Sequence, residues 1–145
     1  MEVYTIGFTR RSAAAFFGAL RESGIRRLLD VRLNNTSQLA GFSKRDDLAY
    51  FLRELCGAEY VHEPLLAPTQ ELLDGYRKAR GSWDAYAEDF LALLAERGVE
   101  RTLDRSLLAG PTVLLCSEPT ADRCHRRLVL EYLAARWGDV TPVHL

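Results

Sequence analysis

The chain has few of the features that would assign it at once to a secreted, membrane or nucleic-acid-binding class of protein. It contains only three cysteines in 145 residues, an odd number that predicts no disulfide framework. Nineteen Lys and Arg residues nearly balance 20 Asp and Glu residues, so the net charge of −1 creates no global field that would attract nucleic acid or an anionic membrane. No apolar run is long enough to span a bilayer, and no basic leader opens the sequence. We therefore expect a cytoplasmic protein in a reduced setting, with no membrane partner.

The composition is that of an ordinary soluble domain. Hydrophobic residues make up 48% of the chain and charged residues 27%, and the length suffices for one buried core. Internal repeats, low-complexity tracts and linker-like stretches are absent from the sequence. We expect a single domain over residues 1–145, and the pattern specifies no oligomeric state.

Apolar runs and helical stripes alternate along the whole chain. Short apolar runs between turn residues predict strands at 3–8, 27–31, 59–63, 113–116 and 140–145. Apolar residues at helical spacing predict helices at 12–24, 43–57, about 71–80, 82–98 and 124–138, with a short amphipathic turn at 103–108. Ser12, either Ser82 or Asp84, and a capping box beginning at Ser43 mark helix starts, and glycines mark the ends.

This alternation predicts an α/β fold with a parallel sheet. We expect a three-layer, Rossmann-like sheet of about five strands in the order 3-2-1-4-5, with helices on both faces. Strands one and four would then be neighbours at the topological switch point, where open α/β sheets bind ligands beyond the carboxyl ends of the strands.

The most informative stretch is the predicted strand that ends at Cys116 and the helix that follows it. That helix opens with Cys124, His125 and Arg126, and we expect Thr120 or Asp122 as its cap. The first turn of a helix favours anions and shifts a thiol toward thiolate, and the Arg126 guanidinium suits a carboxylate or phosphate. The alternative is that Cys124 packs as a small apolar residue and His125 only forms a structural hydrogen bond.

Two other interpretations of the same stretch are less favoured. A Cys-x5-Arg loop, as in cysteine phosphatases and rhodaneses, would need Arg123 one residue earlier, and Pro119 lacks an N–H donor. A metal site at Cys116, Cys124 and His125 has suitable ligand types. However, adjacent helix residues diverge by about 100°, and His62 is expected two strands away. We therefore predict no metal and no cofactor.

Carboxylates and hydroxyls at the same predicted edge complete the candidate site. Glu118 has no evident structural task and is the candidate acid, base or nucleophile. Asp30 and Arg32, at the end of the second strand, are expected to contact a ligand, although an ion-pair network holding the strand ends is the alternative. Thr9 and Ser37 would donate to a ligand or cap turns.

Three sequence blocks also resemble a known family. Tyr-Thr-Ile-Gly-Phe-Thr at 4–9, Leu-Asp-Val-Arg at 29–32, and Leu-Leu-Cys-Ser-Glu at 114–118 followed by Cys-His-Arg at 124–126 are similar to the signature blocks of the DUF488 family. The resemblance covers nearly the whole chain. It implies a small α/β domain and implies no activity, because the family is named for its unknown function.

The site residues support two hypotheses about function. The first is an enzyme that acts on a small anionic ligand, a nucleotide or nucleic-acid fragment, held by Arg32 and Arg126 while Glu118 carries the chemistry. The assisting side chains would be Cys116, Cys124 or His125. The second is a non-catalytic module that binds a nucleotide or a partner protein through the same crevice.

Overall fold

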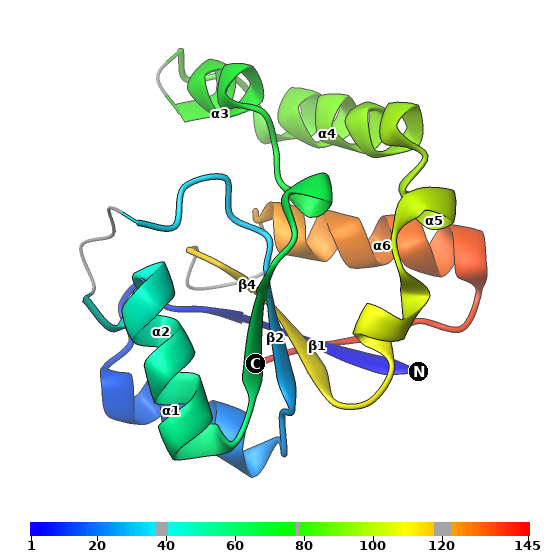
Figure 1. Ribbon diagram of the computed structural model, residues 1–145. Helices are drawn as coiled ribbons and strands as arrows, with labels where there is room; N and C mark the ends of the chain where they lie inside the picture. The colour runs from blue at the N-terminus through cyan, green and yellow to red at the C-terminus, as the bar shows by residue number, and fades with distance from the viewer. Residues whose placement is uncertain (37–40, 78, 118–122) are drawn as a thin grey trace.

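The protein is an alternating α/β structure built around one parallel sheet (Figure 1). The computed structural model describes residues 1–36, 41–77, 79–117 and 123–145. The strands are β1 (Glu2–Gly7), β2 (Arg27–Asp30), β3 (Glu59–His62), β4 (Thr112–Cys116) and β5 (Thr141–His144). The α-helices are α1 (Ala13–Glu22), α2 (Arg45–Phe51), α3 (Gln70–Arg77), α4 (Trp83–Arg97), α5 (Val99–Thr102) and α6 (His125–Trp137). Shorter turns are η1 (Gly41–Ser43), the π-helical η2 (Leu52–Cys56), η3 (Pro64–Leu66) and η4 (Arg105–Leu108).

The predicted fold class is confirmed, and the strand order differs from the prediction by one exchange. The observed order is β3-β2-β4-β1-β5, with every neighbouring pair parallel. As predicted, β1 and β4 are neighbours, and Gly7 is paired with Cys116. However, β4 lies between β1 and β2, so Asp30 is paired with Leu115 of β4.

Burial explains why β4 takes the central position. All five of its residues are buried, whereas β1 begins with the exposed Glu2. A strand that is covered on both faces and has a neighbouring strand on each side is the most completely shielded from water. An unbroken apolar run such as Val113–Leu115 therefore gains the most hydrophobic free energy in that position. The spacing of elements along the chain does not reveal how far the crossover after β3 returns, and the predicted order therefore placed β1, and not β4, beside β2.

The alternation of side chains along β4 divides the interior into two apolar layers. Val113 and Leu115 pack in the cluster that includes Phe16 of α1 and Leu48 of α2. Leu114 and Cys116 belong to the opposite cluster, which α6 and α4 cover. On that side α6 packs on the sheet and α4 packs on α6, with α3 beside α4 (Figure 1).

Local capping follows the sequence at most helix ends. The hydroxyls of Ser12 and Ser82 accept hydrogen bonds from backbone N–H groups in the first turns of α1 and α4, as predicted. Gly138 ends α6 with a φ of 82°, which favours glycine. The capping box predicted at Ser43 is wrong, because Lys44 is the N-cap of α2 and makes no side-chain cap. Ser43 belongs instead to η1, where its carbonyl accepts a hydrogen bond from Arg32.

The last strand, β5, forms one edge of the sheet. The backbone N–H groups of Thr141 and Leu145 donate to the carbonyls of Met1 and Thr5, so alternate N–H positions face β1. Residue 142, between them, faces outward, and it is a proline, which has no N–H.

None of the helices within the described residues combines the length and the apolar character needed to cross a membrane.

Candidate functional site

The candidate site lies where β1, β2 and β4 end and α6 begins. The backbone N–H of Thr9 donates to the Ser117 carbonyl at 3.1 Å, so the chain leaving β1 runs beside the chain leaving β4. This is the juxtaposition that the sequence predicted. Because β4 is central, the exit of β2 lies on the other side of it, and all three exits meet at one edge of the sheet.

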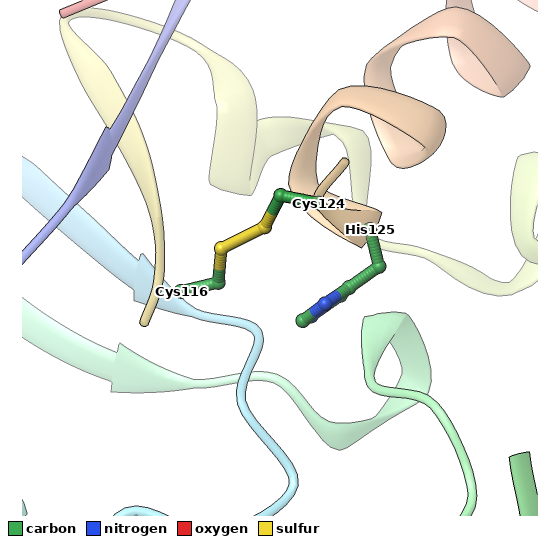
Figure 2. Close-up of side chains that lie close together, drawn as sticks. All are labelled: Cys116, Cys124 and His125. Atoms are coloured by element: carbon green, nitrogen blue, oxygen red, sulfur yellow. A yellow bond between two sulfur atoms is a disulfide. The ribbon is translucent and has the colours of Figure 1, made fainter. Parts of the chain in front are cut away.

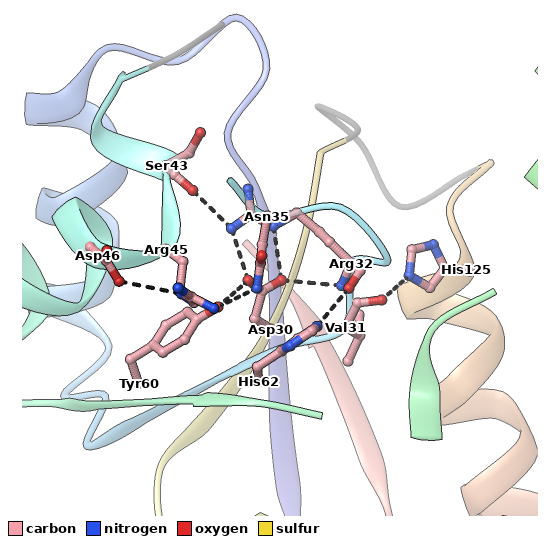
Figure 3. Close-up of polar contacts among 10 residues, drawn as sticks. All are labelled: Asp30, Val31, Arg32, Asn35, Ser43, Arg45, Asp46, Tyr60, His62 and His125. Atoms are coloured by element: carbon pink, nitrogen blue, oxygen red, sulfur yellow. Dashed lines mark hydrogen bonds and ion pairs between the residues drawn. The ribbon is translucent and has the colours of Figure 1, made fainter. Parts of the chain in front are cut away.

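Asp30 and Arg32 form a buried ion pair at the end of β2 (Figure 3). The Nε and Nη2 groups of Arg32 donate to Oδ1 and Oδ2 of Asp30, each at 2.8 Å. Nη2 also donates to the Ser43 carbonyl at 2.8 Å, and the guanidinium lies over the Phe8 ring, 5.3 Å from its centroid. The exposed fractions are 0% for Asp30 and 4% for Arg32, so the pair is closed to solvent in this structure.

Two further side chains hold this ion pair from the neighbouring strand. The Tyr60 hydroxyl donates to Oδ2 of Asp30 at 2.5 Å, and Asn35 Nδ2 donates to the same hydroxyl at 3.0 Å. His62 Nε2 donates to the Arg32 carbonyl at 2.9 Å (Figure 3). Burial, then the hydrogen bond to Asp30 and its negative charge, raise the pKa of Tyr60 well above its ordinary value. These contacts give the pair a structural role, and a ligand contact by Asp30 or Arg32 stays a prediction.

Cys116 and Cys124 are joined by a disulfide between the end of β4 and the start of α6 (Figure 2). The sequence did not predict this bond. In the disulfide form neither sulfur is a thiolate, so the predicted catalytic role of these cysteines remains a prediction for the reduced protein. The third cysteine, Cys56, is a free thiol, and burial raises its pKa.

Arg126 lies against the two sulfur atoms. Its Nη1 is 3.1 Å from Cys116 Sγ and 3.7 Å from Cys124 Sγ, and its side chain is completely buried. The guanidinium therefore faces the sulfur pair and not an open surface. Direct contact between Arg126 and an anionic ligand stays a prediction.

The backbone at the start of α6 differs from the predicted one. The predicted caps, Thr120 and Asp122, lie outside the described residues, and the N-cap is Cys124. Cys124 has φ −137° and ψ 140°, so its backbone is extended and it does not belong to the first helical turn. The helix begins one residue later, at His125.

His125 links α6 to the exit of β2. Its Nε2 lies 2.7 Å from the Val31 carbonyl, and because a carbonyl can only accept, Nε2 carries the proton (Figure 3). The Phe90 ring stands edge-on to the imidazole, with 5.6 Å between the ring centroids. Burial lowers the pKa of His125 to about 4, so the ring is neutral at pH 7.

A small crevice opens beside these groups. We call it the edge crevice: two adjoining hollows that share Leu73, Arg77, Ser117 and His125. One hollow also reaches Arg32, and the other reaches Arg123 and the two disulfide cysteines. Among the described residues that line the edge crevice, the charged ones are all arginines. The crevice is therefore electropositive and suits an anion.

A larger hollow, of about 560 Å³, lies between α3 and α4. Its charged lining residues are Glu71, Asp89 and Glu96, and none of the predicted site residues lines it. Its acidic lining does not suit the anionic ligand that the sequence predicted.

The structure brings most of the predicted residues to one place. Cys116, Cys124, His125 and Arg126 meet at the start of α6, and Asp30 and Arg32 lie next to them through Val31. Thr9 is exposed at the same edge. Ser37 and Glu118 lie outside the described residues.

Sequence reasoning missed Tyr60 and Arg77. Tyr60 belongs to no motif in the sequence, and its hydroxyl completes the Asp30 network. Arg77 ends α3, the helix predicted at about 71–80, and it lines both hollows of the edge crevice. Only a basic residue in the last turn of that helix hinted at it.

The chain is similar to a known protein family. The model of the family described as domain of unknown function DUF488 matches residues 12–133, which is most of the chain. No curated protein and no solved structure matches the chain.

Proposed function

The chain belongs to the DUF488 family, and we propose that it is an enzyme that binds a small anionic ligand in the edge crevice. The ligand class proposed is a nucleotide or a nucleic-acid fragment, of which one phosphate group would enter the crevice, since its two hollows measure only about 20 and 70 Å³. The observation that carries the proposal is that arginines supply all the charge among the described lining residues, at the carboxyl edge of a parallel sheet.

Two exposed arginines would hold the anion. Arg77 reaches the crevice from the end of α3, and Arg123 reaches it from the residue before the N-cap of α6. Each offers a forked guanidinium suited to phosphate oxygens. The sequence predicted Arg32 and Arg126 as the ligands. In this proposal the buried Arg126 would add positive charge from behind the crevice wall, whereas the charge of Arg32 is balanced by Asp30.

Neutral donors at the crevice would complete the anion site. Ser117 lines both hollows, and α6 begins beside them with an N-cap, Cys124, whose side chain makes no capping hydrogen bond. The positive end of this 13-residue helix adds to the attraction of the arginines for an anion.

The chemistry is assigned to Glu118. This residue directly follows Ser117 in the sequence, and Ser117 lines the crevice. A carboxylate there would act as acid, base or nucleophile toward the bound ligand. His125, which is neutral and already donates to Val31, would position the crevice wall and would not be the main acid.

A non-catalytic module is the second candidate function. It is favoured by the pairing of the nearest described ionisable groups, since Asp30 is neutralised by Arg32 and His125 is held by Val31. Such a module would bind the same anion and leave it unchanged.

Thermal-shift measurements with inorganic phosphate, nucleoside mono-, di- and triphosphates and short oligonucleotides test the proposal. A ligand should raise the melting temperature of the wild type, and Arg77→Ala or Arg123→Ala should weaken its binding by at least about tenfold, the typical cost of one charged hydrogen bond. Arg53→Ala is the matched control, because Arg53 is exposed on η2 and does not line the crevice.

Mass spectrometry of the bound ligand separates the two functions. Conversion that is lost in Glu118→Gln supports the enzyme, while binding without conversion supports the module. If none of the anions shifts the melting temperature, or if Arg53→Ala weakens binding as much as the crevice variants, the proposal is wrong.

A further inference from the structure

We propose that Cys116, Cys124 and His125 form a site for one transition-metal ion, of the class represented by Zn²⁺, when the disulfide is reduced. The two sulfur atoms and one imidazole nitrogen lie within 4.8 Å of one another (Figure 2). Thiolate and imidazole are the ligands that zinc prefers in proteins. The site does not depend on the anion-binding function proposed above.

The backbone at Cys124 removes the objection that sequence reasoning raised. Cys124 and His125 would diverge by about 100° if both were helical. However, Cys124 is extended, with φ −137° and ψ 140°, and only His125 belongs to α6. The two neighbouring side chains can therefore approach a single ion, together with Cys116 from the end of β4.

A hydrogen bond to the backbone fixes the tautomer of the imidazole. Because Nε2–H donates to the Val31 carbonyl at 2.7 Å, Nδ1 carries the lone pair that a metal needs. Ligating histidines in proteins characteristically donate their other N–H to a backbone carbonyl or carboxylate, which fixes the ring and its tautomer. The Phe90 ring packs edge-on against the same imidazole and limits its rotation.

The spacing of the two cysteines also suits a bridging ion. Their Cα atoms are 7.5 Å apart. This distance exceeds the range of about 4.4–6.8 Å that is usual for a disulfide. Two thiolates on one tetrahedral zinc, at about 2.3 Å each, stand about 3.8 Å from each other. Once the S–S bond is broken, the two sulfur atoms can move apart to this distance while the backbones of Cys116 and Cys124 stay where they are.

Reduction of the disulfide and binding of zinc are two separate steps. A thiol or phosphine reductant supplies two electrons, and with two protons these convert the disulfide into two thiols. Zn²⁺ then binds as the two thiols release their protons, so the ion and two thiolates form a neutral unit. Arg126 Nη1, at 3.1 Å from Cys116 Sγ, is placed to donate to a thiolate sulfur from outside the ligand set.

Three protein ligands leave a fourth position for water or another small ligand. Cys116, Cys124 and His125 all line the hollow of the edge crevice that Arg123 also reaches. A three-ligand set with an access route is typical of catalytic zinc sites, whereas structural sites have four protein ligands. The oxidised protein, with its sulfurs bonded to each other, should bind no zinc.

Metal content of the purified full chain tests the proposal. After reduction, incubation with Zn²⁺ and gel filtration, the wild type should carry about one zinc per chain by elemental analysis, as a single site requires. The disulfide form should carry none. Cys116→Ser, Cys124→Ser and His125→Asn should each lose the bound zinc.

Two matched controls are available within the chain. Cys56→Ser removes the cysteine outside the cluster, and His62→Asn removes a histidine that also donates to a backbone carbonyl through Nε2. Both should retain full zinc content. Cobalt spectra provide a second measurement on the unaltered wild type, since Co²⁺ in the same site should give thiolate charge-transfer bands and the intense visible bands of tetrahedral coordination.

Several results would overturn the proposal. One is reduced wild type that binds no more zinc than the Cys116→Ser/Cys124→Ser double variant; another is zinc loss in Cys56→Ser. If a ligand variant fails to fold, the cobalt spectrum of the wild type decides, and a spectrum without thiolate charge transfer contradicts the site. Because the zinc experiments contain no nucleotide, their outcome is independent of the anion-binding tests.

Discussion

Arg32 donates two hydrogen bonds of 2.8 Å to the carboxylate of Asp30, two residues earlier in the chain, where both side chains are closed to water. The pair lies at the end of β2. The Tyr60 hydroxyl, from β3, donates a hydrogen bond to Asp30, and Arg32 donates one to the Ser43 carbonyl. The pair therefore fixes the positions of several loops around the edge crevice. If either partner of a buried ion pair is removed, the other is left as an uncompensated buried charge.

Removing one charge of this pair should destabilise the protein strongly. Asp30→Asn leaves the Arg32 guanidinium buried without its counter-charge, and we expect a loss of about 3–5 kcal/mol in the free energy of unfolding. The double variant Asp30→Asn/Arg32→Met should lose less than the sum of the two single variants, because it removes both charges. Urea denaturation measures all three, and strictly additive losses would contradict the coupling.

Tyr60 should make stability depend on alkaline pH. Its folded pKa is raised, mainly by burial and then by Asp30, above the value of about 10 for an unfolded tyrosine. Above that pH the unfolded chain releases the phenolic proton while the folded chain retains it, so the free energy of unfolding should fall as the pH rises. Urea denaturation at pH 9 and pH 10.5 should show a smaller fall in Tyr60→Phe than in the wild type. Tyr50→Phe, at a tyrosine that is 52% exposed, should behave as the wild type does.

Two glycine-to-alanine changes should act in opposite directions. Gly18 is inside α1, and a Cβ there would meet no atom within 4 Å, so Gly18→Ala should stabilise the protein by about 0.5–1 kcal/mol. A Cβ at Gly138 would also meet nothing, but its φ of 82° is unfavourable for alanine, so Gly138→Ala should cost about 1 kcal/mol. Thermal denaturation should give melting temperatures on opposite sides of the wild-type value. Equal shifts for the two variants would show that the backbone conformation at Gly138 is not the deciding factor.

The disulfide should be visible in the number of thiols that can be alkylated. Oxidised protein, unfolded without reductant, should take one alkyl group, at Cys56, and fully reduced protein should take three. Cys116→Ser should take two without reductant, because Cys124 loses its partner. Intact-mass spectrometry counts the groups, and three labels on the oxidised wild type would contradict the bond.

The fold could be predicted as far as local patterns determine it. Alternating apolar runs and helical stripes gave the α/β class, the parallel sheet and the pairing of β1 with β4. The insertion of β4 between β1 and β2 could not be predicted in the same way. It depends on which strand gains most from complete burial, and that is a property of the assembled sheet.

The candidate site was predicted in composition better than in geometry. The convergence of Cys116, Cys124, His125 and Arg126 followed from a strand end and a helix start. The extended backbone at Cys124 did not, because a cap residue and a first-turn residue look alike in a single sequence. The link from Tyr60 to Asp30 was also missed, since it depends on the register between β2 and β3.

Pro142 in β5 has a consequence for how copies of this chain behave at high concentration. The outward side of that edge lacks the amide hydrogen that an incoming strand would bind at residue 142, and His144 provides the next outward position. A second molecule therefore finds an incomplete ladder there. Pairing of a further strand with β5 is therefore unfavourable, which hinders edge-to-edge association of native molecules at this strand.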